Sequence, residues 1–508
     1  MFNNYSAPFR IGLDPKLIAF SDLRTIQNKL KPGFELIPVE KNLIDQLAQK
    51  DLPARPNNEV YVQPLQYAGK TVNEKLKDIH DYLVENDAHA IVITMLDELS
   101  WLFNLRGSDV EYNPIFFAYA IITKDSNNIF INSARLTTEA IDQIKNSNVN
   151  IHNYEEFYSN LNQLSVDAKA VGKKVHIGNK ANWSIARHLG DETTQIVKSP
   201  VTDAKAIKND VELQGSRNAH KRDGIALVQY FAWLEYQLKS TSEPLKEYDA
   251  ALKLEQYRSE LDNFKGLSFN TISATGSNGA IIHYSPSTTD SDIIDLNKIY
   301  LCDSGAQFLD GTTDITRTYF FGENPSQEQK VAFTRVLQGH IALANAVFPT
   351  DKVPGTLIDI LARMPLYREG LDYRHGTGHG ISSHGPAHEG PHVISPKYND
   401  VTLKNGMLVS NEPGFYKDGE FGIRTESILA VVNADTPNNF GGQGFSTFET
   451  LTICPIGINL IDIDLLNQYE KSWLNSYHKR CRDELLPELQ KRGDGRAIEW
   501  LEKTTKTI

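Results

Sequence analysis

The chain has 508 residues, a length that corresponds to roughly three domains. Apolar residues make up 40% and charged residues 23% of it, an ordinary globular composition that argues against a disordered chain. The formal net charge of −12 argues against a broad nucleic-acid interface, because such interfaces neutralise phosphates with Lys and Arg.

Nothing in the sequence predicts a membrane span or an exported, disulfide-bonded protein. The longest apolar run, residues 115–122, is too short for a membrane helix and predicts a buried strand. The first ten residues show no secretory signal. The 3 cysteines lack CxxC spacing, which is typical of a reducing compartment, and we expect a cytoplasmic protein.

The first 64 residues combine pieces of secondary structure with a linker. Residues 10–20 and 34–40 resemble strands, residues 21–31 resemble a helix, and residues 50–64 are polar and contain prolines, as linkers do. About sixty residues are marginal for an independent core. We therefore expect residues 1–64 to be the remnant of a first N-terminal domain plus a linker.

Residues 65–205 alternate helices and strands, which is typical of an α/β domain. Thr71 and Glu74 form a capping-box pattern, and apolar residues then recur on one face of a helix up to Leu83. Strands are expected at residues 90–94, 115–122, 128–132 and 174–177, with helices at 138–145 and 154–164.

Residues 206–508 open with long helices and then concentrate residues that bind metals. Helices are expected at residues 210–239, 247–263 and 326–347, and again from residue 465. Between them lie four segments rich in carboxylates and histidines, with Asp303, Asp314, His375, His379, His384, His388, Glu412 and Glu426.

Each of these residues also has an ordinary structural explanation. A lone Asp is usually a surface residue, and the histidines could be scattered polar residues of a loop. Glu412 and Glu426, however, follow apolar strand-like residues, where an unpaired carboxylate would be costly. Two Asp, one His and two Glu form a hard ligand set that suits Mn²⁺ or Mg²⁺. Five ligands are too many for one catalytic ion and match two ions that share carboxylates.

The segments DSGAQFLDGTTDITRT, HGTGHG…HEGP, NEPGFY and FGIRTES resemble the metal-binding segments of the pita-bread metallopeptidases. Within that family, WLFNLRGSDVEYNP and GRAIEWL resemble the long cytosolic X-Pro aminopeptidases, the aminopeptidase P group. The resemblance implies a creatinase-like α/β domain over residues 65–205. A pita-bread catalytic domain with a helical C-terminal tail would follow over residues 206–508. It also implies that the chain begins late in the first of two N-terminal domains.

The resemblance assigns roles position by position. The implied metal ligands are Asp303 for one ion, Asp314 and Glu426 as bridges, and His379 and Glu412 for the other ion. The implied catalytic residues are Glu412, His388, His375 and His283. The implied substrate-binding residues are His283, His375, His388, Tyr416 and Arg424. Thr316 and Arg424 would orient ligands, and His384 is expected to be a loop residue rather than a sixth ligand.

The implied reaction releases the N-terminal residue from peptides with proline in the second position, by attack of a hydroxide that bridges two Mn²⁺ ions. Glu412 would be the base, and His388 or His283 would stabilise the oxyanion. Expected partners are such peptides and a second copy of the chain, bound through the catalytic domain, with no nucleic acid and no membrane. The alternatives are a prolidase-type X-Pro dipeptidase and an inactive peptidase fold used for binding.

Overall fold

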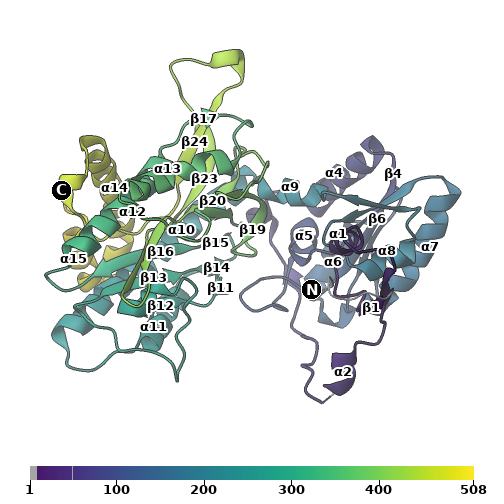
Figure 1. The fold of residues 1–508 in the computed structure, drawn as a ribbon, viewed down its shortest axis with the longest axis horizontal. Coiled ribbons are helices and arrows are strands. Elements are labelled where there is room, and N and C mark those ends of the chain that lie inside the picture. The colour runs from purple at the N-terminus through teal and green to yellow at the C-terminus, as the bar shows by residue number, and fades with distance from the viewer. Residues whose placement is uncertain (1–8, 49) are drawn as a thin grey trace. The chain divides into compact units, whose positions relative to one another are not determined.

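The computed structural model describes residues 9–48 and 50–508, which divide into two units (Figure 1). The first unit holds the described residues up to Leu65, together with residues 70–110 and 114–205. The second holds residues 66–69, 111–113 and 206–508. In the described parts of the chain, no helix has the length and apolar character that a membrane crossing requires.

A six-stranded mixed sheet forms the centre of the first unit, with the strand order β10-β9-β4-β6-β7-β8. β4 pairs parallel with β9 and antiparallel with β6. The strands are β4 (Ala88–Ile93), β6 (Tyr119–Thr123), β7 (Asn127–Phe130), β8 (Val149–His152), β9 (Lys174–Gly178) and β10 (Thr194–Val197).

Helices cover both faces of this sheet, so alternate residues of β4 enter two different cores. Ile91 and Ile93 pack in one core with α4 (Val72–Glu85), α5 (Leu96–Leu102) and α6 (Thr138–Asn146). Ala90 and Val92 pack in the other core with α7 (Phe157–Ala170) and α8 (Trp183–Leu189). This period of two is the reason why the buried strand reads as a continuous apolar run. The predicted capping box of α4 is confirmed, with Thr71 accepting from Glu74 N.

The N-terminal segment packs against the α7 and α8 face of the same unit. β1 (Phe9–Leu13) pairs parallel with β2 (Phe34–Pro38), and α1 (Phe20–Gln27) lies between them in the sequence. Phe20, Leu23 and Leu36 are buried in the core of that face. A short helix, α2 (Leu43–Leu47), follows.

One sequence prediction for the first unit is wrong. Only the end of the run 115–122 is a strand, because Asp109 binds the preceding backbone: Phe117 N donates to Asp109 Oδ2 at 2.7 Å, and Asp109 N donates to Ile115 O at 3.0 Å. The expected linker 50–64 contains a strand, β3 (Tyr61–Val62), which pairs with β5 (Leu105–Arg106). Neither feature follows from local periodicity.

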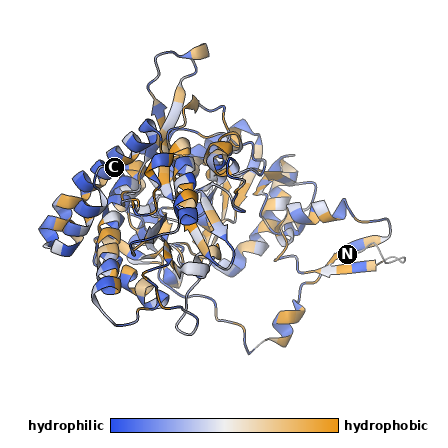
Figure 2. Cartoon of the chain, turned by 60° about the vertical axis from the view of Figure 1, so that its left-hand side comes forward, coloured by the Kyte–Doolittle hydropathy of each residue, from blue (hydrophilic) through white to orange (hydrophobic). Residues whose placement is uncertain are grey.

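The second unit is built from long helices and several small sheets. Asn209 caps the first and longest of these helices through a capping box with Glu212. The helices are α10 (Asp210–Ser240), α11 (Glu247–Ser259), α12 (Gln327–Ala344), α13 (Gly355–Tyr367), α14 (Gln468–Arg492) and α15 (Gly495–Thr504). A short helix, α3 (Leu65–Ala68), also belongs largely to this unit, whereas α9 (Pro200–Ala206) lies almost wholly in the first unit. Like those of the first unit, the helices of the second unit carry both hydrophilic and hydrophobic residues along their length (Figure 2).

The strands of the second unit form four sheets. Their orders are β12-β13-β16, β11-β14-β15, β21-β22 and β17-β24-β23-β20-β18-β19. The first two sheets use β11 (Phe264–Leu267), β12 (Ile272–Thr275), β13 (Ile299–Ser304), β14 (Ala306–Phe308), β15 (Gly311–Thr312) and β16 (Ile315–Phe320). The others use β17 (Phe348–Pro349), β18 (Gly378–Gly380), β19 (Glu389–Ile394), β20 (Leu408–Asn411), β21 (Gly414–Lys417), β22 (Phe421–Arg424), β23 (Ser427–Ala434) and β24 (Phe445–Thr450).

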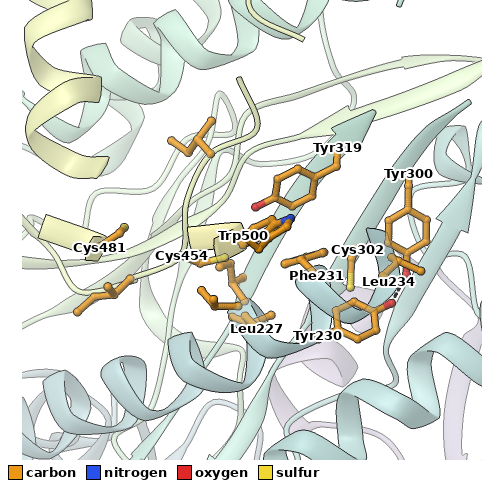
Figure 3. Packing of buried hydrophobic residues seen from close by; sticks show 14 of the residues in the cluster. Leu227, Tyr230, Phe231, Leu234, Tyr300, Cys302, Tyr319, Cys454, Cys481 and Trp500 are labelled. Carbon is orange, nitrogen blue, oxygen red and sulfur yellow. Dashed lines mark hydrogen bonds between the residues drawn. The ribbon is translucent and has the colours of Figure 1, made fainter. Parts of the chain in front are cut away.

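In the core of this unit, α10 packs against one face of β13 and β16, and polar residues of these strands lie on the other face. Phe231 packs against Tyr319, with ring centroids 4.5 Å apart, and Trp500 of α15 joins them (Figure 3). Nearby, the hydroxyl groups of Tyr230 and Tyr300 are hydrogen-bonded at 2.6 Å. This packing fixes the strands whose opposite faces carry the candidate ligands.

Candidate functional site

Five side chains expected to bind metal come from separate strands that end in one region of the second unit. Asp303 lies on β13, and Asp314 directly precedes β16. His379 lies on β18 and Glu412 directly follows β20. Glu426 lies between β22 and β23. The strand ends thus bring together residues that are up to 123 positions apart in the sequence.

A cavity of about 720 Å³ collects these residues and most of the other predicted site residues. Its walls include His283, Asp303, Asp314, His375, His379, His388, Glu412, Arg424 and Glu426. Tyr416 does not line the cavity but is hydrogen-bonded to two residues that do. The structure therefore gathers the whole predicted set at one place.

The metal-binding atom of His379 lies close to those of two carboxylates. Its Nε2 lies 3.5 Å from Asp314 Oδ2 and 3.4 Å from Glu412 Oε1. One donor atom each of Asp314, His379 and Glu426 lie within 4.8 Å of one another, a spacing that could hold a metal ion. Asp303 and Glu412 stand in the walls of the same cavity.

Burial and mutual repulsion make Asp303, Glu412 and Glu426 hold protons more tightly than usual. Burial raises the pKa of Asp303 and of Glu426, and the neighbouring carboxylates add to both shifts. The same effects raise the pKa of Glu412 to about 7. Burial lowers the pKa of His379, but Asp314 and Glu412 outweigh it and raise that pKa to about 9. The raised pKa of His379 indicates that the carboxylates around it favour positive charge.

The hydrogen bonding of Asp303 indicates whether this set of metal-type ligands fits a cation. Asp303 Oδ2 accepts a hydrogen bond from Arg424 Nη2 at 2.5 Å. Asp303 Oδ1 is buried and has no hydrogen-bond partner among the described residues. Buried carboxylate oxygens are normally satisfied, so this oxygen calls for a ligand. Together with three further carboxylates and one imidazole, it fits hard divalent ions.

A chain of hydrogen bonds leads from a metal-type carboxylate to a histidine of the cavity wall. Thr316 Oγ1 donates to Glu426 Oε2 at 2.8 Å and accepts from Arg424 Nε at 3.0 Å. Arg424 Nη1 donates to Tyr416 Oη at 2.6 Å. Tyr416 Oη lies 2.8 Å from His375 Nε2. Arg424 thereby orients both halves of the site.

The protonation state of His375 follows from its contacts. Burial lowers its pKa to about 3, and the charge of Arg424 adds to this, so the ring is neutral at neutral pH. His375 Nδ1 lies 2.8 Å from Gly376 O, which can only accept, so Nδ1 carries the proton. Nε2 therefore accepts from the hydroxyl of Tyr416.

Close contact between β18 and β20 sets the distance from His379 to Glu412. A Cβ added to Gly378 would lie 1.9 Å from Ser410 O, so this position requires glycine. Ser410 Oγ accepts from His379 N and donates to Glu412 Oε1, both at 2.9 Å. Glu412 N donates to Thr377 O at 2.8 Å. The backbone thus fixes both ligands.

An ion pair that the sequence does not reveal holds the histidine loop from behind. Arg363 of α13 donates to His375 O and to Asp359 Oδ2, both at 2.7 Å. The first of these hydrogen bonds is partly buried and the second is buried. Asp359 Oδ1 accepts from Thr377 Oγ1 at 2.6 Å. An Arg four residues after an Asp looks like an ordinary helix-surface pair, so only the fold shows its role.

The remaining wall residues include one histidine that the resemblance implies and a lining that it does not. His283 lies exposed in a turn that follows β12. The apolar and aromatic lining resembles core positions in the sequence; it comprises Phe269, Ile272, Ile282, Tyr284, Val393 and Tyr398. His384 is buried in the loop between β18 and β19 and is not among the lining residues.

Comparisons with family models divide the chain in three. Residues 51–212 match the creatinase/prolidase N-terminal domain, and residues 214–433 match metallopeptidase family M24. Residues 444–508 match the C-terminal region of the M24 peptidases. The predicted fold class, a creatinase-like α/β domain followed by a pita-bread domain, is thus confirmed.

Individual relatives agree along the whole chain. A protein of Laccaria bicolor named "Probable Xaa-Pro aminopeptidase P" is 49% identical over 99% of this chain and 78% of its own length. The protein of that name from Aspergillus niger is 46% identical over 98% of this chain and 82% of its own.

A solved structure also matches almost the whole chain. The X-prolyl aminopeptidase of Caenorhabditis elegans, described as a cytosolic enzyme with a di-nuclear active site, has a TM-score of 0.95. It is 36% identical over 99% of this chain and 82% of its own. The prolidase of Pyrococcus horikoshii, 22% identical with a TM-score of 0.57 over 75% of this chain and 99% of its own, shares the fold.

Proposed function

The chain belongs to the Xaa-Pro aminopeptidase P family, and we propose how its residues perform the metal-dependent removal of an N-terminal residue that precedes proline. It is a hydrolase, a metallo-exopeptidase. The observation that carries the residue assignments is the convergence of five hard donors, one with an orphaned buried oxygen, on a single cavity.

Two divalent ions would be held by Asp303, Asp314, His379, Glu412 and Glu426. When bound, they supply charge that activates a water molecule at neutral pH and stabilises the developing oxyanion. Mn²⁺ is the proposed metal, because four carboxylates and one imidazole suit it. The di-nuclear site described for the Caenorhabditis elegans enzyme supports the number of ions.

Glu412 is the proposed general base. Its Oε1 is already engaged by the hydroxyl of Ser410, while Oε2 lies 3.9 Å from His375 Nδ1. Glu412 takes the proton of the attacking water and returns it to the leaving nitrogen. That nitrogen belongs to proline, a tertiary amide without N–H, so it leaves only when a proton is delivered to it.

The histidines of the cavity wall are the proposed substrate contacts. The ring of His388 lies 4.1 Å from that of His379, centroid to centroid, yet His388 is exposed to the cavity rather than enclosed among the ligands. It would donate to the carbonyl oxygen that becomes the oxyanion, and His283, which lines the same cavity, is the other candidate for this role. We propose that His375 contacts the residues after the scissile bond, and that Tyr416 and Arg424 hold it through their hydrogen bonds.

We also propose a homodimer formed through the catalytic domain. The outward face of α13 exposes large apolar side chains at helical spacing, between 36% and 64% accessible: Leu357, Ile360, Leu361, Met364 and Tyr367. A stripe of this kind marks an interaction surface, and a two-fold dimer would bury it against its own copy. Light scattering of wild type and of Met364→Lys tests this: the variant should be monomeric.

The remaining proposals concern location and organisation. A cytoplasmic location is supported by the description of the Caenorhabditis elegans enzyme and by three buried, free cysteines. A domain boundary between residues 205 and 206 is supported by the change from one compact unit to the other at that point.

Peptide hydrolysis by metal-stripped protein, with and without Mn²⁺, tests the function. Arg-Pro-Pro should be cleaved after Arg only when the ion is present. Preference for the dipeptide Gly-Pro would instead indicate a prolidase. Full metal loading without turnover of either peptide would contradict the catalytic assignment.

A further inference from the structure

A buried carboxylate outside the donor cluster, Glu247, fastens the segment that carries His283. Glu247 is the first residue of α11 and is 0% exposed. Its Oε1 accepts from Thr275 N at 2.6 Å, and its Oε2 accepts from Tyr284 Oη at 2.6 Å and from Asp292 N at 3.0 Å. Asn278 Nδ2 lies 3.1 Å from both oxygens. A single carboxylate thus satisfies four uncharged donors.

These donors stand on both sides of His283 in the sequence. Thr275 and Asn278 precede it, Tyr284 adjoins it and Asp292 follows it. His283 itself is exposed and makes no hydrogen bond within the described part of the chain. The position of its ring therefore depends on how firmly its backbone is held, and Glu247 is the common anchor of that backbone.

The contacts predict a local role rather than a role in overall folding. The far end of the segment has its own attachments, since Glu247 N donates to Asp292 O at 3.0 Å and Ile294 N donates to Leu245 O at 2.9 Å. The end next to His283 is held through the carboxylate, by way of Tyr284 and Asn278. Tyr284 also lines the cavity, so a shift there moves the cavity wall.

We propose that Glu247 is a positioning residue for peptide hydrolysis, which fixes the turn of residues 281–285 and with it His283 against the substrate. Its effect on catalysis rests on the proposed function. In Glu247→Gln, an amide nitrogen replaces one carboxylate oxygen and faces the backbone N–H of either Thr275 or Asp292, from which it cannot accept, so at least one of the four contacts is lost. Tyr284→Phe removes one of these contacts by deleting the hydroxyl that donates to Glu247, and it keeps the aromatic ring.

The matched control is Glu98→Gln in the first unit. Glu98 is another buried carboxylate that accepts from uncharged donors, the hydroxyls of Ser199 and Thr202. The two Glu-to-Gln changes are chemically alike, so any general cost of neutralising a buried carboxylate appears in both.

Hydrogen–deuterium exchange of the metal-free protein gives a readout that does not need activity. Exchange of residues 276–285 should become faster in Glu247→Gln and in Tyr284→Phe, and remain as in wild type in Glu98→Gln. Unchanged exchange in both test variants would overturn the proposal. If Glu247→Gln fails to fold, Tyr284→Phe alone decides it.

The catalytic arm is a double-mutant cycle with His283→Ala, measured on Arg-Pro-Pro at equal metal content. Glu247→Gln should lower kcat/KM about 10-fold or more, because small misplacements of a catalytic group are costly, mainly through KM. In the His283→Ala background the same change should have little further effect. An equal loss in both backgrounds would refute positioning through His283. Failure of wild type to cleave the peptide would refute the proposed function instead, while the exchange result still decides whether Glu247 holds the turn.

Discussion

Replacing Glu412 with Gln separates its role as a base from its role in the fold. Gln keeps the shape of the side chain and can still accept from Ser410 Oγ, which now contacts Glu412 Oε1 at 2.9 Å. It cannot take a proton from water. Loss of a positioned base costs about 10²–10⁴ in rate, or about 3–5 kcal/mol of transition-state stabilisation. We expect kcat to fall by that factor at equal metal content.

The same change should stabilise the metal-free protein, and the structure gives the sign and size. The pKa of Glu412 is raised from 4.5 to about 7, so the folded protein binds this proton more tightly than the unfolded chain does. The stability that results is present below pH 4.5 and is lost as the pH rises to about 7. The ionised carboxylate therefore costs about 3 kcal/mol at pH 8, at about 1.4 kcal/mol per tenfold change in the ionisation constant. Gln avoids that cost.

Urea unfolding of both proteins in a chelator, at several pH values, measures this effect. His375 contributes with the opposite sign, because its lowered pKa of about 3 gives stability that is lost as the pH falls below 6.5. The difference between wild type and Glu412→Gln removes the contribution of His375. This difference should grow in favour of the variant as the pH rises from 4.5 to 7. A difference that does not depend on pH, or near-normal turnover at full metal occupancy, would refute the reasoning.

Three further changes test other parts of the site. His388→Ala should lower kcat about 10²-fold with unchanged metal content; an emptied site, seen by elemental analysis, would instead make His388 a ligand. Arg363→Met should cost about 3–5 kcal/mol in urea unfolding, because it leaves the carboxylate of Asp359 buried and unpaired; a cost below that of the exposed control Arg374→Met would contradict the role of the ion pair. Chelation should lower Tm, and Mn²⁺ at 100 times the Kd of a site should restore about 2.7 kcal/mol for each ion bound; calorimetry that shows no ion-dependent shift would contradict the metal site.

The local parts of the fold could be predicted because they depend on near neighbours in the sequence. The capping residues Thr71 and Glu74 and the apolar spacing after them define α4 without reference to the rest of the chain. The strand prediction for the run 115–122 was wrong because the conformation of the run depends on a residue outside it. Its apolar residues are buried as expected, but the carboxylate of Asp109 takes a backbone N–H that a strand would give to a ladder. Burial can be inferred from composition, whereas the partner of a backbone group cannot.

The candidate ligands could be predicted because their chemistry is unusual for their surroundings in the sequence. The residues that position these ligands could not be predicted, because they look ordinary. A carboxylate after an apolar strand, as at Glu412, is conspicuous in any sequence. Arg363 and Glu247 look like ordinary helix residues, yet one binds the carbonyl of His375 and the other the hydroxyl of Tyr284. Their partners are 12 and 37 positions away, and no periodicity connects them.

The charge of the cavity explains why the proposed site takes two ions. Asp303, Asp314, Glu412 and Glu426 share it with the guanidinium of Arg424 and with His379, whose ring must be neutral to bind a metal ion. With all four carboxylates ionised to bind metal, the site has an excess of negative charge that burial makes costly. A single divalent ion would leave the cavity negative, and an oxyanion formed there would be repelled. A second ion would offset this charge. When Glu412 takes the proton of the water, its negative charge passes to the oxyanion, and two bound ions would stabilise the charge at its new position. The transition state is therefore stabilised more than the uncharged peptide, which is the difference that raises kcat.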